Sequence, residues 1–195
     1  MAMNPRYYQQ ATVNKLNQVF DQGTAVSSWR PFAREGRRIY QPVVDIAVGP
    51  FATETQFILE YNDLVREHEG LIDKWIQMFQ VNWDGLEHTR PLAVLPPGPS
   101  NHQNFLGGYS NQNARCFIAV EIENETTRKH LMGSIVSAGA LGRIGILIAW
   151  QDKVLRAAIR MREYFDFLRR VEKRTFDMTG VLVLTPEQFA SSLDL

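Results

Sequence analysis

Residues 117 to 123 read Phe-Ile-Ala-Val-Glu-Ile-Glu, an apolar run that ends in two carboxylates, Glu121 and Glu123. Its β-branched and aromatic residues predict a buried β-strand. Side chains alternate along a strand, so both carboxylates point to the same face, about 6.6 Å apart at Cα. Acids on a face that otherwise belongs in the core cost free energy unless they are paired, solvated or bound to a cation. The two glutamates are therefore the first residues of a candidate site.

The chain after this strand alternates between helical and strand patterns. We expect a helix over 128–141, a strand over 144–150, a helix over 153–171, a short strand over 180–184 and a last helix that begins at Thr185-Pro186. The small residues of the first of these helices would let it lie close against a sheet. This order is typical of an α/β fold in which neighbouring strands run parallel.

The chain before the strand is less regular. A helix over 5–20 precedes an irregular basic segment over 29–38 and a short strand over 43–48. Helical spacing continues over 54–80, and Gly70 is the residue at which this helix could break. Residues 91–113 are rich in Pro, Gly, Asn and Gln, and a loop of this length is a functional loop, a lid or a disordered insertion.

Composition limits the class of protein. The chain has 195 residues, of which 45% are hydrophobic, enough for one domain with a substantial core. Basic and acidic residues both total 21, so the overall charge favours no nucleic-acid, membrane or acidic partner. The single cysteine, Cys116, excludes an intrachain disulfide and is expected to be a buried thiol. The polar N-terminus and the short apolar stretches predict a cytoplasmic protein with no membrane partner.

A third acid interrupts the strand over 43–48. Asp45 stands between Val43-Val44 and Ile46-Ala47-Val48. If this strand pairs with the strand of Glu121, three carboxylates converge at one end of a sheet. Mg²⁺ prefers such hard oxygen ligands, and a bound metal ion activates water and stabilises charge on a phosphoryl group. Solvent-exposed strand ends, or buried ion pairs with nearby arginines, would account for the same three acids.

These pieces resemble the PD-(D/E)xK, or restriction endonuclease-like, nuclease superfamily. The resemblance is carried by Pro42-Val43-Val44-Asp45, by Glu121-Ile122-Glu123, and by the helix and strand that follow to Trp150. The core of that superfamily is an αβββαβ unit with an Asp on one strand and an acid-x-Lys on the next. The resemblance implies one nuclease-like domain over 1–195, in which a central mixed sheet is flanked by helices and carries a helical and loop insertion over about 54–113.

The resemblance also implies a site. Asp45 and Glu121 would bind Mg²⁺, or Mn²⁺ in its place, and DNA would be the substrate. Glu123 stands where the superfamily usually has Lys, as Glu does in some restriction enzymes, and is a candidate catalytic residue and metal ligand with the other two acids. Lys129 could replace the missing positive charge by reaching back over the strand end. The alternative for Lys129 is a solvated lysine in the first turn of a helix.

Three functions remain open from the sequence. One is a Mg²⁺-dependent phosphodiesterase that acts on DNA by in-line attack of metal-bound water. Another is a catalytically inactive module on the same fold that binds nucleic acid or protein. The last is a homo-oligomer, such as a homodimer, with the helix over 153–171 at its interface. Arginines gather in two segments of the sequence. They could contact phosphates, or they could form a solvated face that is partly ion-paired. These arginines are Arg30, Arg34, Arg37, Arg38, Arg156, Arg160, Arg162, Arg169, Arg170 and Arg174.

Overall fold

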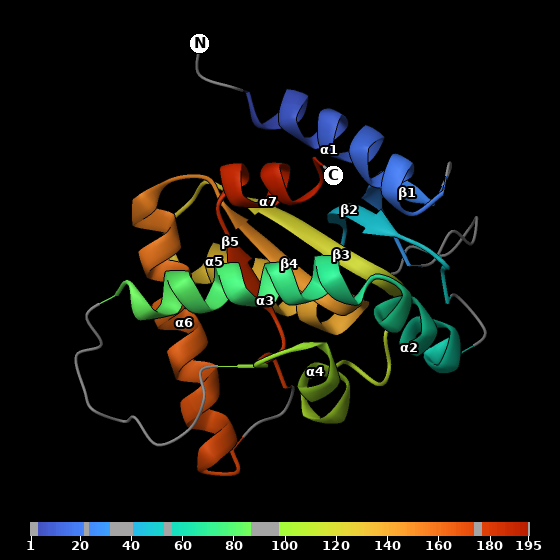
Figure 1. The fold of residues 1–195 in the computed structure, drawn as a ribbon. Helices are drawn as coiled ribbons and strands as arrows, with labels where there is room; N and C mark the ends of the chain where they lie inside the picture. Colours follow the sequence, from blue (N-terminus) through green and yellow to red (C-terminus); the bar gives the residue numbers. More distant parts are fainter. Residues whose placement is uncertain are drawn as a thin grey trace.

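A mixed β-sheet forms the centre of the computed structural model, which describes residues 4–21, 24–31, 41–52, 56–86, 98–173 and 177–194 (Figure 1). The five strands of this part of the chain lie side by side in chain order: β1 (Ala25–Trp29), β2 (Val44–Val48), β3 (Cys116–Glu123), β4 (Gly142–Ala149) and β5 (Leu182–Leu184). β1, β2 and β3 are antiparallel neighbours, whereas β3, β4 and β5 run parallel. The predicted α/β class with a central mixed sheet is confirmed.

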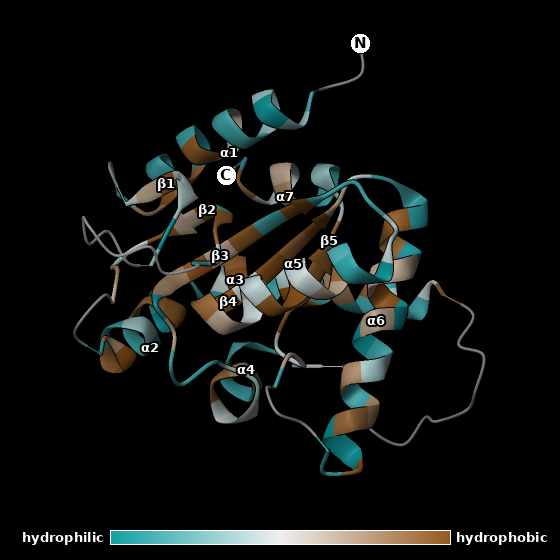
Figure 2. Ribbon diagram, turned by 180° about the vertical axis from the view of Figure 1, so that it is seen from behind, coloured by the Kyte–Doolittle hydropathy of each residue, from teal (hydrophilic) through white to brown (hydrophobic). Residues whose placement is uncertain are grey.

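Helices cover both faces of the sheet. The described helices are α1 (Pro5–Val19), α2 (Ile58–Glu67), α3 (Glu69–Asp84), α4 (His102–Gly108), α5 (Arg128–Leu141), α6 (Asp152–Arg170) and α7 (Pro186–Ser192). α3 crosses one face and α5 crosses the opposite face, while α6 extends well beyond the sheet (Figures 1 and 2). The strands are coloured largely as hydrophobic in Figure 2, as expected for a sheet that is covered on both sides.

The ends of several helices follow from local chemistry. The side chain of Asn4 accepts a hydrogen bond from the N–H of Arg6, and Pro5 occupies the first turn of α1. Thr185 and Gln188 form a reciprocal capping box at the start of α7, as the Thr-Pro sequence predicts. α5 has the bounds that its sequence pattern predicts.

Small residues let α5 lie close against the sheet. A Cβ atom added to Gly145 of β4 would lie 2.9 Å from the carbonyl carbon of Ala138 and 3.0 Å from its oxygen. Backbone meets backbone at this point, with no side chain between them. This close contact sets the distance between α5 and the sheet. It therefore also sets how far the side chains of α5 reach toward β3.

Three sequence-based expectations are corrected. β1 was not expected, because Val26-Ser27-Ser28-Trp29 has no strong strand pattern; it forms by pairing with β2. The long helix breaks at His68, whose ring lies edge-on to Phe20 at 4.5 Å, and Gly70 is helical. The segment expected to be irregular contains α4. Its residues 91–97, like the basic residues 32–40, lie outside the described residues.

Two further features concern the single cysteine and the length of the helices. Cys116 is a buried free thiol, as predicted. No helix in the described part of the chain has both the length and the apolar character of a membrane span.

Candidate active site

The strands of Asp45 and Glu121 are neighbours. β2 and β3 pair antiparallel, with Ile46 opposite Val120 and Ala47 opposite Ala119. The same register places Asp45 opposite Glu121. Oδ2 of Asp45 accepts a hydrogen bond from the backbone N–H of Ile122 at 2.7 Å. The structure therefore brings together two acids that are 76 positions apart in the sequence.

The two carboxyl groups raise the cost of ionising this site. Burial raises the pKa of Glu121 to about 9, together with the negative charges of Asp45 and Glu123 and a hydrogen bond to Asp45. Burial also raises the pKa of Asp45, as does the charge of Glu123, while hydrogen bonds from Ile122 and Glu121 act in the opposite direction. With a pKa of about 9, Glu121 is the acid of the pair that favours its protonated form at neutral pH.

Glu123 is held by the next helix. Its Oε1 accepts a hydrogen bond from the N–H of Glu125, and its Oε2 accepts one from the hydroxyl of Ser134, both at 2.7 Å. Ser134 lies on α5, so the close packing of α5 against the sheet fixes this carboxylate. Glu123 is buried but still acts on the other two acids, because its charge raises the pKa of both.

No cation balances these acids in the described part of the chain. The ion pairs formed there involve other residues, so buried pairs with arginine, an alternative that the sequence left open, are not seen for Asp45, Glu121 or Glu123. Nor do any three or more Asp, Glu, His or Cys side chains among the described residues surround a common point as metal ligands. The site thus consists of two adjacent carboxyl groups and a third acid held beside them.

This donor set nevertheless fits a hard divalent cation. Asp45 and Glu121 offer carboxylate oxygens, and Mg²⁺ takes one or two carboxylates in proteins while it keeps several of its waters. A cation at the pair would favour the ionised form of Glu121 and offset the repulsion among three acids. Mn²⁺ has the same preference for oxygen ligands.

Lys129 does not contact the acids. It lies in the first turn of α5, is exposed, and forms no hydrogen bond or ion pair with any residue that the structure describes. This is the solvated position that the sequence left as the alternative. The neighbouring His130 is also exposed. Glu35, a further acid of the basic segment, lies outside the described residues.

Sequence reasoning missed three polar groups around the site. The amide of Gln9 on α1 donates to the carbonyl oxygen of Asp45. Ser134 was noted only as a small residue, and its bond to Glu123 requires the packed helix. The side chain of Gln151, which precedes α6, donates to Asn124 at 2.7 Å. No residue type or spacing signals these contacts, since each depends on how the elements are packed.

Comparison with known proteins adds no family assignment. No protein-family model, curated protein or solved structure matches the chain. The functional interpretation therefore rests on the geometry of Asp45, Glu121 and Glu123.

Proposed function

We propose that the protein is a divalent-cation-dependent phosphodiesterase that acts on DNA as an endonuclease, with Asp45 and Glu121 as metal ligands. The observation that carries the proposal is the Asp45–Glu121 pair. Two adjacent antiparallel strands present these acids side by side, largely buried and without a cationic partner among the described residues. Such an arrangement costs stability, and acids kept in this state are typical of functional sites.

The order of elements supports the proposal. α1, β1, β2, β3, α5 and β4 follow one another as αβββαβ, the order that the resemblance to PD-(D/E)xK nucleases implies. α2, α3 and α4 form the insertion between β2 and β3. Asp45 lies on β2 and Glu121 on β3, two strands that are neighbours in the sheet.

Each acid of the site has a different role in the proposed reaction. A bound Mg²⁺ or Mn²⁺ would supply Lewis-acid stabilisation of the phosphate and a lowered pKa for water. Asp45 is held in place by the N–H of Ile122, and Glu121 must release its proton before it can act as a ligand. Glu123 is fixed by Ser134 and has further lone pairs, so it can accept a hydrogen bond from the attacking water and orient it toward phosphorus.

The test is isothermal titration of Mn²⁺, combined with cleavage of plasmid and linear DNA by the same preparations. Wild type should bind Mn²⁺ and cut DNA, and Asp45→Asn should do neither. Glu125→Gln is the matched control, because its side chain is exposed beside the site and carries the same charge. Wild type that neither binds Mn²⁺ nor cuts DNA would overturn the proposal.

A second function is favoured by one observation. Glu123 occupies the place of the usual Lys and Lys129 points to solvent, so no positive side chain among the described residues stands at the acids. A nuclease-fold module that binds nucleic acid or protein without cleavage would have this arrangement. DNA binding by wild type that is unaccompanied by cleavage in Mn²⁺ would favour this function over the enzyme.

A further inference from the structure

One face of α6 is exposed along its whole length and has two chemically distinct halves. We call this face the α6 stripe; it consists of Lys153, Arg156, Arg160, Tyr164, Phe167 and Val171. Spacings of three and four residues place these side chains on a single side of the helix. The first half is basic and the second half is aromatic and apolar.

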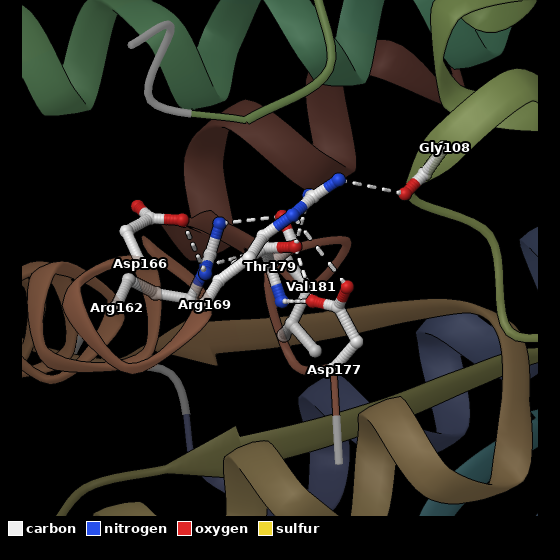
Figure 3. A network of polar contacts seen from close by, with 7 residues as sticks. All are labelled: Gly108, Arg162, Asp166, Arg169, Asp177, Thr179 and Val181. Atoms are coloured by element: carbon white, nitrogen blue, oxygen red, sulfur yellow. Dashed lines mark hydrogen bonds and ion pairs between the residues drawn. The ribbon is translucent and has the colours of Figure 1, made fainter. Parts of the chain in front are cut away.

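The cations of the stripe are available to a ligand. Lys153, Arg156 and Arg160 are exposed and form no ion pair or hydrogen bond within the described residues. Other arginines of α6 hold the fold: Figure 3 shows Arg162 and Arg169 turned toward Thr179, with Arg169 also reaching Gly108. The arginines of one helix thus separate into a structural group and a group that faces solvent.

The aromatic half is equally open. Tyr164 is 47% exposed, Phe167 43% and Val171 42%, which is unusual for three large apolar side chains on one helical face. Phe165, between them, is buried and anchors the helix. An aromatic ring on the surface beside a line of cations suits a base and its phosphate, because stacking tolerates any base and the cations neutralise the backbone.

The stripe begins at the acids. The N–H of Trp150 donates to the carbonyl oxygen of Glu123 at 2.9 Å, and α6 starts two residues later. The basic half is therefore at the end of α6 that is nearer to the backbone of Glu123, and the aromatic half lies farther along the helix, where α6 extends beyond the sheet (Figure 1). A chain laid on the stripe would have one end near the C-terminal end of β3.

We propose that the α6 stripe binds single-stranded DNA and leads it to the acids, with Lys153, Arg156 and Arg160 on phosphates and with Tyr164 and Phe167 stacked on unpaired bases. This inference rests on the proposed phosphodiesterase function and adds its substrate form. A duplex hides the faces of its bases in its own stack, so the aromatic half favours an unpaired strand. The distance from Lys153 to Phe167 is about 21 Å along the helix, which corresponds to about six stacked nucleotides.

The test measures binding apart from cleavage. Fluorescence anisotropy of a labelled oligothymidylate of about twelve nucleotides, and of a duplex of equal length, is followed in EDTA. Wild type should prefer the single strand. Tyr164→Ala with Phe167→Ala should weaken single-strand binding about fivefold or more and remove the preference. Leu59→Ala, at a 74% exposed leucine of α2, is the control for loss of surface apolar area and should leave binding unchanged.

A second set of variants tests the basic half of the α6 stripe. Replacing Lys153, Arg156 and Arg160 by Gln should weaken binding of single strand and duplex alike. It should also reduce the slope of log affinity against log salt by about 2, because each phosphate contact on a single strand contributes about 0.7. Circular dichroism should show the same fold for both sets of variants, since all the altered side chains are exposed.

Several outcomes would overturn the inference. One is unchanged single-strand affinity in the aromatic double variant. Another is that wild type does not bind the oligonucleotide and that the same substitutions either convert a dimer into a monomer in sedimentation or abolish binding to anionic vesicles. The stripe would then be a surface for a protein partner or for a membrane. Wild type that binds the oligonucleotide through the stripe but fails to bind Mn²⁺ and to cleave would overturn the proposed hydrolysis alone.

Discussion

Asp45 and Ile122 join β2 to β3 through a hydrogen bond of 2.7 Å from the Ile122 N–H to the Asp45 carboxylate. The Asp45 side chain thus accepts a hydrogen bond from a backbone N–H of the neighbouring strand. This bond fixes Asp45 beside Glu121 at the point where the sheet is otherwise apolar. The rigidity of the pair therefore belongs to the strands and not to a loop, as a preorganised site requires.

Replacing Glu121 should change how stability depends on pH. The pKa of Glu121 is about 9 in the folded protein and 4.5 ordinarily, so the folded state keeps a proton that the unfolded chain loses. Its contribution to the free energy of unfolding is therefore fully present below pH 4.5 and falls as the pH rises toward 9. Glu121→Gln should raise the free energy of unfolding at pH 8 by up to about 5 kcal/mol, measured by urea unfolding, and leave it nearly unchanged at pH 4. Glu125→Gln should leave the pH dependence as in wild type.

Metal binding should release a proton. A cation at the Asp45–Glu121 pair must displace the proton that Glu121 holds at pH 7. Titration of Mn²⁺ in two buffers with different ionisation enthalpies should report about one proton released per ion bound in wild type. Equal heats in both buffers would contradict the release of a proton from Glu121.

Ser134→Ala should destabilise the protein by about 1–2 kcal/mol, because it leaves one oxygen of buried Glu123 without its donor. Ser137→Ala is the matched control, since Ser137 is on the same helix, is half-buried and forms no hydrogen bond within the described residues. Chemical denaturation of both variants measures the difference. Equal effects at the two serines would indicate that the bond to Glu123 contributes nothing.

Arg162→Met should lower the free energy of unfolding by about 3 kcal/mol or more. The Arg162 side chain is fully buried and donates through Nε to the Val181 carbonyl at 2.9 Å and through Nη2 to the Thr179 carbonyl at 2.6 Å (Figure 3). Its guanidinium also lies over the Phe79 ring. Its loss leaves buried carbonyls without donors. Arg162→Lys should be almost as destabilising as Arg162→Met, because one ammonium group cannot donate in the two directions that the planar guanidinium of arginine does.

Arg160→Met serves as the control for Arg162→Met. Arg160 is an exposed arginine on the same helix, so its substitution should change the free energy of unfolding by no more than about 0.5 kcal/mol. A similar loss of stability at both positions would contradict the structural role of Arg162.

Two glycines should respond oppositely to alanine. Gly145→Ala should destabilise by about 1–3 kcal/mol, because the new methyl would meet the Ala138 backbone, which cannot move without shifting α5. Gly133 has nothing within 4 Å of its added Cβ and lies inside α5, so Gly133→Ala should stabilise by about 0.5–1 kcal/mol. Thermal unfolding of the two variants against wild type would measure both effects, and shifts of the same sign would contradict the close packing of α5.

Local signals in the sequence were enough for much of the fold. The apolar run before Glu121 predicted β3, the Thr185-Pro186 start predicted α7, and the helical spacing predicted α5 and α6. Such elements depend on hydrophobic periodicity and on caps, which act between residues close in the chain.

Local signals failed where a partner decides the structure. Ser27 and Ser28 became part of β1 only because Ala25 pairs with Val48 and Trp29 with Val44. Arg162 was expected among phosphate-binding or solvated arginines, and it is buried because carbonyl oxygens of another segment accept its protons. Lys129 was a candidate catalytic residue, but the start of α5 places it in solvent.

The sequence by itself determined the type of most elements and the candidate acids, because periodicity and residue chemistry are properties of short stretches. Only the tertiary structure decided that Asp45 lies opposite Glu121, that Glu123 is held by Ser134, and that the pKa of Glu121 is raised. These facts depend on strand pairing and helix packing between residues far apart in the chain. Burial and mutual repulsion, which set the chemistry of the acids, exist only once those residues have come together.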